Sequence, residues 1–179
     1  MQGATIHNLT VALSDADRGV YEELELRLAR HPSESMRYLV TRLLAYALSY
    51  EEGIAFSKGG VSSTDEPPVS IRDLTGALIA WIDVGSPTAA RLHKASKAAK
   101  RVALFTSANV AYLEAEEIHR KADIAVSIFN ATFLDALAER IDRRTEMELV
   151  RSGGALYVTI GGKTIEGETL AKSLAAGQA

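Results

Sequence analysis

Short apolar segments alternate with helical patterns between residues 77 and 144, and this alternation constrains the fold more than any other feature of the sequence. Buried strands are predicted at 77–84, 101–106 and 124–129. Helical spacing follows them over 88–100, 114–123 and 134–144. Because parallel strands need long crossover connections, this order predicts a parallel or mixed sheet with helices packed on it.

The N-terminal part of the chain predicts two strands and a long helix. Residues 5–13 alternate loosely, and in 22–31 leucines on one face alternate with charged residues on the other, which favours half-buried strands. Apolar residues then recur at helical spacing from Met36 to about Tyr50, with Ser33 as the expected N-cap.

The remaining segments complete a single α+β/α/β domain spanning residues 1–179, with a mixed central sheet flanked by helices. Residues 54–60 indicate a short strand entering a loop, and the polar, proline-bearing 62–70 indicate an exposed turn or strand edge. A hairpin is predicted over 155–167, with two glycines at its turn, and 170–179 are expected to form a flexible tail.

Composition narrows the functional classes. The chain has no cysteine, which excludes disulfides, thiolate zinc sites and cysteine nucleophiles. Its net charge of −3 gives no global attraction to nucleic acid, so any phosphate-binding surface has to be local. The N-terminus lacks a signal-peptide pattern, and no apolar run approaches the roughly 20 residues of a membrane span. We therefore expect a cytoplasmic protein without a membrane partner; its oligomeric state stays open.

Asp83 is the most informative acid because it lies near the end of the apolar segment 77–84, just before Gly85. In a strand it shares a side with Trp81 and is expected to be buried. A buried carboxylate needs a cation, a metal or several hydrogen-bond donors. An ion pair with a lysine of the following helix and a metal site both satisfy that need.

The predicted helix 88–100 supplies the cations. A basic face is formed by Arg91, Lys94, Lys97 and Arg101. This pattern is typical of an ordinary solvated face, and it equally suits a phosphate contact or a catalytic lysine. Further acids have simple structural explanations: Glu34 complements a helix N-terminus, while Asp65 and Glu66 lie in a loop.

Several segments together resemble the YaeQ family. They are 4–6 (ATI), 28–34 (LARHPSE), 42–47 (RLLAYA), 65–67 (DEP), 81–87 (WIDVGSP) and 91–95 (RLHKA). The resemblance runs in order to about residue 106 and is thin beyond it. It implies a fold related to the PD-(D/E)XK nuclease superfamily and no settled function.

The resemblance also implies roles for particular residues. Asp83 matches the acid of the D/E-x-K motif and Asp65, or its neighbour Glu66, the preceding acid, while Glu34 matches the helix acid. Gly85 stands where that motif has its lysine, so Lys94 on the following helix would replace it, with Lys97 as a reserve. Asp65, Asp83 and Glu34 would then hold Mg²⁺ or Mn²⁺, which prefer oxygen ligands.

Two functional hypotheses follow. In the first, the protein is a metal-dependent nuclease or phosphodiesterase that acts on nucleic acid through Asp65, Asp83 and Lys94. In the second, it is a non-catalytic binding or regulatory protein with a nuclease-like fold, whose acids form ion pairs with Lys94 and Arg91.

Overall fold

The computed structural model describes residues 3–58 and 65–175. The strands are β1 (Thr5–Asp15), β2 (Val20–Arg30), β3 (Ile54–Phe56), β4 (Val69–Arg72), β5 (Leu78–Val84), β6 (Arg101–Thr106), β7 (Ile124–Phe129), β8 (Arg144–Ser152), β9 (Ala155–Ile160) and β10 (Lys163–Leu174). The helices are α1 (Met36–Leu48), α2 (Ala89–Ala98), α3 (Ala111–Ala115) and α4 (Ala131–Ala138), with a 3₁₀ turn at Ile118–Arg120.

All these strands belong to one sheet, in the order β2-β1-β8-β9-β10-β7-β6-β5-β4-β3. Parallel pairing joins β1 to β8, β5 to β6 and β6 to β7, and the other neighbours are antiparallel. The predicted mixed sheet is therefore confirmed, and most of its pairings are antiparallel.

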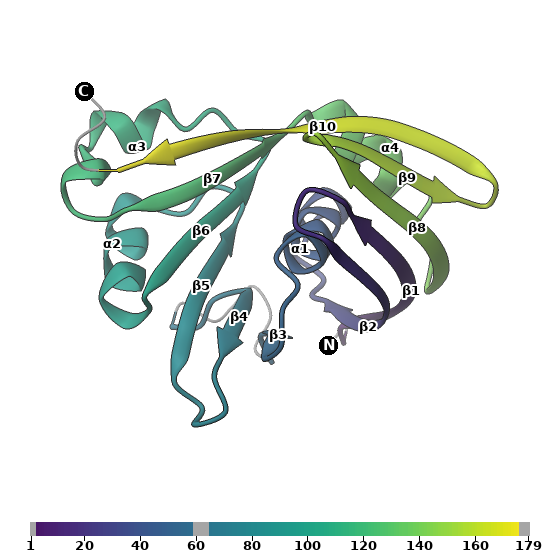
Figure 1. The fold of residues 1–179 in the computed structure, drawn as a ribbon, viewed down its shortest axis with the longest axis horizontal. Coiled ribbons are helices and arrows are strands. Elements are labelled where there is room, and N and C mark those ends of the chain that lie inside the picture. Colours follow the sequence, from purple (N-terminus) through teal and green to yellow (C-terminus); the bar gives the residue numbers. More distant parts are fainter. Residues whose placement is uncertain (1–2, 59–64, 176–179) are drawn as a thin grey trace.

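The sheet bends into two wings that face each other across α1, and its shape approaches an open barrel (Figure 1). We call β1, β2, β8 and β9 the β1 wing, and β3 to β7 the β6 wing. The long strand β10 connects them: residues 163–168 pair with β9, and residues 169–174 pair with β7. Gly167 lies at this crossing, where a Cβ atom would be 2.5 Å from the ring of Phe133 in α4.

Two hydrophobic cores hold the fold. The larger lies inside the bend, where leucines of α1 pack against the inward side chains of both wings, such as Val11, Leu149 and Ile82. The smaller lies on the opposite face of the β6 wing, where Trp81 and Leu104 pack against α2. Alternate residues of β5 and β6 thus serve different cores, as the period-2 geometry of a strand requires.

The first half of the chain and the C-terminal hairpin follow the sequence closely. The strands expected at 5–13 and 22–31 are β1 and β2, and the long helix is α1. Its N-cap is Ser35, not Ser33: the Ser35 hydroxyl accepts a hydrogen bond from the Tyr38 N–H at 3.1 Å. The hairpin turn is confirmed at Gly161 and Gly162, both with positive φ.

Two helix predictions are right only for their first residues, which lie in α3 and α4. In place of a helix at 114–123, α3 ends at Ala115, and Glu117 adopts a left-handed conformation (φ 54°) that lets Ile118 reach the core. In place of a helix at 134–144, α4 ends at Ala138 and β8 begins at Arg144. Residues 139–143 form a turn, and the chain then enters β8, whose pairing with β1 buries alternate residues.

Two boundary segments also differ from expectation. Within 62–70, Pro67 and Pro68 are buried, in contrast to the exposed turn that we expected, and Val69 begins β4; residues 62–64 lie outside the described part. At the C-terminus, β10 continues to Leu174 within the expected tail, and residues 176–179 lie outside the described part.

Candidate functional site

Asp83 lies in the penultimate position of β5, and its side chain points to the α2 face of the sheet together with Trp81. The residue is only 2% exposed. Its carboxylate accepts hydrogen bonds from the indole Nε1 of Trp81 at 3.1 Å, from Nε of Arg91 at 2.7 Å and from the backbone N–H of Val84 at 3.2 Å. Charge and hydrogen-bonding capacity of this buried acid are thereby both satisfied.

Arg91 connects three parts of the site. It lies in the first turn of α2, where the hydroxyl of the N-cap Thr88 accepts a hydrogen bond from the Arg91 N–H. Its guanidinium lies over the Trp81 ring, 5.2 Å from the ring centroid, and its Nη2 donates to the carbonyl of Glu66 at 3.0 Å. A planar guanidinium suits this combination of stacking and directed hydrogen bonds.

Asp65 and Lys94 form a second ion pair beside this one. The Lys94 Nζ is 2.6 Å from the Asp65 carboxylate, but the two side chains are 59% and 80% exposed. The hydrogen bond from Lys94 lowers the pKa of Asp65 below its ordinary value. Solvent screening makes such an exposed pair a weak contributor to stability.

Glu34 lies before the first turn of α1 and is 3% exposed. One oxygen is 3.0 Å from Nη2 of Arg42, and the other accepts the backbone N–H of His31 at 3.2 Å. Burial raises the pKa of Glu34, although the charge of Arg42 acts in the opposite direction. The Nη2 of Arg42 also donates to the carbonyl of Ala29 at 2.9 Å.

Tyr38 is a site residue that the sequence analysis did not identify. Burial and then the negative charge of Asp83 raise the pKa of Tyr38 to about 12, and Glu34 adds to the rise. Its ring also lies 3.5 Å from the position that a Cβ of Gly85 would take. Tyr38 thus lies close to both the strand acid and the helix acid; it is partly buried in the first turn of α1, where no sequence motif marked it.

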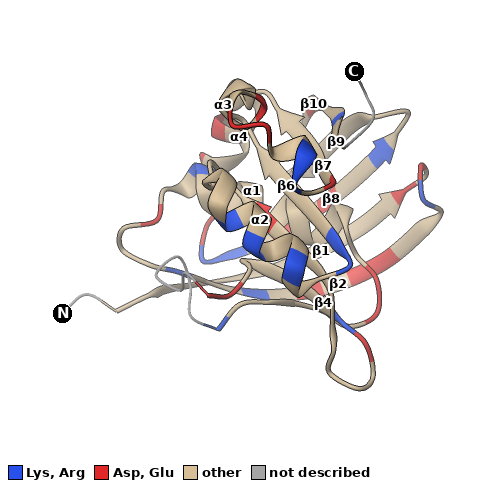
Figure 2. Ribbon diagram, turned by 90° about the vertical axis from the view of Figure 1, so that its left-hand side faces the viewer, with Lys and Arg blue, Asp and Glu red and all other residues tan. Residues whose placement is uncertain are grey.

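The structure brings most of the predicted residues to one corner of the molecule, which we call the α2 corner: Asp65, Glu66, Asp83, Arg91 and Lys94. Lys97 is exposed further along α2, and Glu34 has its own partner on α1. Figure 2 shows lysine and arginine residues following one another along α2. The three candidate metal ligands therefore each pair with a different cation: Asp65 with Lys94, Asp83 with Arg91 and Glu34 with Arg42.

This arrangement does not fit a divalent metal at Asp83, because the Arg91 guanidinium takes the position beside the carboxylate that a metal would need. Across residues 3–58 and 65–175, no group of three or more His, Asp or Glu side chains is placed to hold a metal ion. Among the same residues, no helix has the length and apolar character to cross a membrane.

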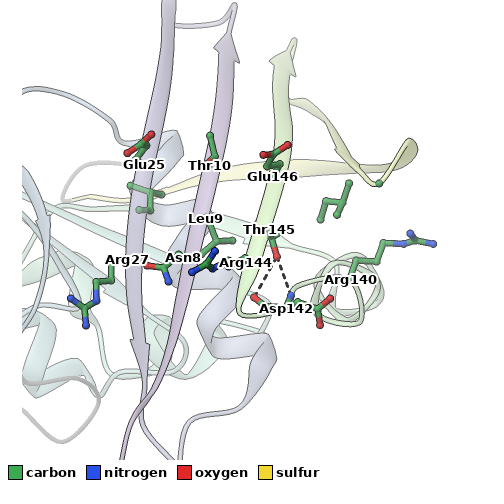
Figure 3. A pocket seen from close by; sticks show the side chains of 13 residues that line it. Asn8, Leu9, Thr10, Glu25, Arg27, Arg140, Asp142, Arg144, Thr145 and Glu146 are labelled. Atoms are coloured by element: carbon green, nitrogen blue, oxygen red, sulfur yellow. Dashed lines mark hydrogen bonds between the residues drawn. The ribbon is translucent and has the colours of Figure 1, made fainter.

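A separate polar depression lies on the outer face of the β1 wing, with a volume of about 800 Å³ (Figure 3). Strand register produces it: Arg27 and Arg144 both pair with Asn8, and one pair further along, Glu25 and Glu146 both pair with Thr10. A cationic row and an anionic row therefore lie next to each other on this face, as is typical of a solvated sheet surface.

Comparisons with known proteins agree on one family. The family model described as YaeQ protein matches residues 1–169, which extends well beyond the segments up to residue 106 that carry the sequence resemblance. An uncharacterized protein YaeQ of Salmonella typhi is 31% identical over 161 residues, which cover 87% of this chain and 88% of that protein. The Escherichia coli K12 protein of the same name is 39% identical over 103 residues, with 58% and 56% coverage.

Solved structures extend the likeness to the fold. The crystal structure of the YaeQ protein from Pseudomonas syringae has a TM-score of 0.87 and 31% identity, covering 94% of this chain and 95% of that chain. The YaeQ protein from Xanthomonas axonopodis pv. citri has a TM-score of 0.86 and 28% identity, covering 94% and 98%. The chain belongs to the YaeQ family.

Proposed function

We propose that this protein is a non-catalytic nucleic-acid-binding protein with a nuclease-related fold. The main observation for this proposal is that the Asp83 carboxylate is buried and accepts hydrogen bonds from Trp81, Arg91 and Val84. A catalytic metal ligand needs an open position next to its oxygens. Here Asp83 instead attaches α2 and the 65–66 segment to the sheet through Arg91.

The binding surface in this proposal is the exposed side of α2. Lys94 and Lys97 are both exposed and lie three residues apart on this helix. Arg91 gives this helix a fixed position, so the lysines form a fixed row. A row of ammonium groups contacts phosphates without reading bases, and its binding weakens as salt rises.

The structural role of Asp83 is tested by denaturant unfolding of Asp83→Asn in the absence of metal. The substitution leaves the Arg91 guanidinium without its charge partner, so we expect a loss of roughly 1–3 kcal/mol in the free energy of unfolding. Calorimetric titration with Mn²⁺ should give no binding heat for the wild type. A stabilised variant, together with Mn²⁺ binding that Asp83→Ala abolishes, would contradict the proposal.

The binding role is tested by fluorescence anisotropy with labelled single-stranded DNA, double-stranded DNA and RNA at low salt. Lys97→Glu should weaken binding and reduce its salt dependence, because one phosphate contact is lost. Lys163→Glu, which changes net charge equally but lies at the β9–β10 turn, serves as the control. Absence of binding to all three nucleic acids would overturn this role.

A second candidate is a Mg²⁺- or Mn²⁺-dependent nuclease, with Asp65, Asp83 and Glu34 as metal ligands and Lys94 as the catalytic cation. The observation in its favour is that Asp65 and Lys94 lie beside Asp83 in the α2 corner. Glu66 and Lys97 would support the site. This function requires Arg91 to leave Asp83. Metal-dependent cleavage of a nucleic-acid panel that is lost in Asp65→Asn would establish it, and it would displace the first proposal.

A further inference from the structure

A second cleft lies on the concave side of the sheet, on the face of the β6 wing opposite to α2. It has a volume of about 510 Å³, within the range of roughly 300–1,000 Å³ that is typical of small-molecule sites. It opens where α1 ends at Leu48, so the helix covers the strand ends near Phe105 and leaves the beginnings of β6 and β7 uncovered. Figure 1 shows α1 and the two wings around this region.

The floor of the cleft is apolar and contains small side chains. Strand register aligns Ile82, Ala103, Ala125 and Ser173 in one row across four strands. Ala125 is exposed, whereas its neighbours Ile124 and Val126 point to the other face and pack in the α2 core. The two alanines therefore leave room above the sheet that larger residues would fill.

The rim of the cleft is mainly cationic. Four cations line it, Arg18, Lys100, Arg101 and Arg151, against two carboxylates, Glu51 and Asp123. Carboxylates offset most of this charge, because Glu51 pairs with Arg101, and Asp15 and Asp17 lie beside the two other arginines. The rim therefore offers oriented guanidinium groups and the Lys100 ammonium around an apolar floor, without a large net charge.

Two of the rim arginines are held in position from behind. Asp15 is fully buried and binds Nε of Arg18 at 2.8 Å and Nη2 of Arg151 at 2.6 Å. Arg18 also donates to the carbonyl of Tyr50 at 3.1 Å, just beyond the end of α1. Guanidinium groups that are already oriented lose little conformational entropy when a ligand binds.

We propose that this cleft binds a small organic anion, with an apolar body on the alanine floor and a carboxylate or sulfonate group at the cationic rim. The oriented cationic donors of the rim and the uncovered apolar floor carry the inference. It stands independently of the α2 corner, because the cleft lies on the other face of the sheet and shares no residue with that site. The anion would regulate the protein or be carried by it, and its site is separate from the nucleic-acid surface proposed on α2.

The test is a fluorescence titration of the full chain with 8-anilinonaphthalene-1-sulfonate as the probe. The neutral N-phenyl-1-naphthylamine serves as its uncharged counterpart. The sulfonate should bind saturably with one site per chain and at least tenfold more tightly than the neutral compound. Equal binding of the two compounds would overturn the role of the cationic rim and, with it, the proposal.

Two pairs of variants locate the site. Ala125→Leu fills the floor and should weaken sulfonate binding at least tenfold, whereas Ala98→Leu, the same change at an exposed position of α2, should not. Lys100→Glu should weaken binding by a similar factor, and Lys163→Glu should leave it unchanged. Thermal unfolding by circular dichroism checks that each variant is folded. Unchanged binding in folded Ala125→Leu or Lys100→Glu would place the probe elsewhere and overturn the inference.

Discussion

A buried carboxylate bound by arginine lies near each end of α1, but the pKa of one carboxylate is lowered and the pKa of the other is raised. At the C-terminal end, Asp15 is bound by Arg18 and Arg151 through side-chain hydrogen bonds of 2.6–2.9 Å. At the N-terminal end, Glu34 has one arginine partner, Arg42, at 3.0 Å. Both acids are almost completely inaccessible to solvent.

The pKa values record this difference. Burial alone would raise the pKa of Asp15, but the hydrogen bonds from Arg151 and Arg18 outweigh it and lower that pKa. For Glu34 burial dominates and the pKa rises. Asp15 keeps a stabilised ionised form because two arginines donate hydrogen bonds to it, whereas Glu34 is desolvated more strongly and has one arginine beside it.

The largest effect is expected for Asp15→Asn. The amide cannot balance two guanidinium groups, and Arg18 also loses the anchor from which it caps the carbonyls at the end of α1. We expect a loss of about 3 kcal/mol in unfolding free energy, at the lower end for a broken buried pair because both arginines are partly exposed. Urea unfolding at pH 7 measures this loss of unfolding free energy. A loss as small as that expected for an exposed ion pair would contradict the difference drawn between Asp15 and Glu34.

The pH dependence of the Asp15 contribution has a defined sign. Because its folded pKa lies below the ordinary value of 3.8, its contribution is complete above that pH and disappears as pH falls through the folded pKa. The stability difference between wild type and Asp15→Asn should therefore be constant from pH 7 to about 4 and shrink below it. A difference that already shrinks between pH 7 and 5 would contradict the lowered pKa.

Glu34→Gln should show a smaller effect with the opposite pH dependence. The folded pKa of Glu34 is raised above 4.5, so wild-type stability falls as pH rises from 4.5 through the folded pKa. The advantage of wild type over the variant, roughly 1 kcal/mol, should be larger at pH 4 than at pH 8. Urea midpoints of both proteins at the two pH values give the comparison, and a larger advantage at pH 8 would reverse the assignment.

The smallest effects are expected where ion pairs are exposed. Asp65→Asn breaks the pair with Lys94, and Asp135→Asn breaks the pair with Arg37, in which both side chains are nearly half exposed. Water and salt replace such partners readily. Neither substitution should move the urea midpoint measurably. A clear shift for Asp65→Asn alone would mean that the α2 corner depends on more than Asp83.

The candidate site was partly readable from the sequence. An acid in an apolar strand next to a tryptophan pointed to burial and to a cation from the following helix, and Asp83 meets both expectations. The partner is Arg91 rather than a lysine, because the first turn of α2 lies against the end of β5. Tyr38 could not be found in the same way, since Asp83, whose charge adds to the rise of its pKa, comes 45 positions later in the chain.

The sequence by itself determined the local elements whose own residues carry the signal: the period of β1, β2 and α1, the glycines of the β9–β10 turn and the order of strands and helices around β5 to β7. Only the tertiary structure decided the rest. Residues 144–152 are a strand because β1 offers hydrogen bonds on one side and β9 on the other. The Asp15 cluster exists only because β1 pairs with β8, which sets Asp15 beside Arg151, more than 100 residues later in the chain. The cleft exists only when the wings face each other, because Arg151 comes from one wing and Ala125 from the other.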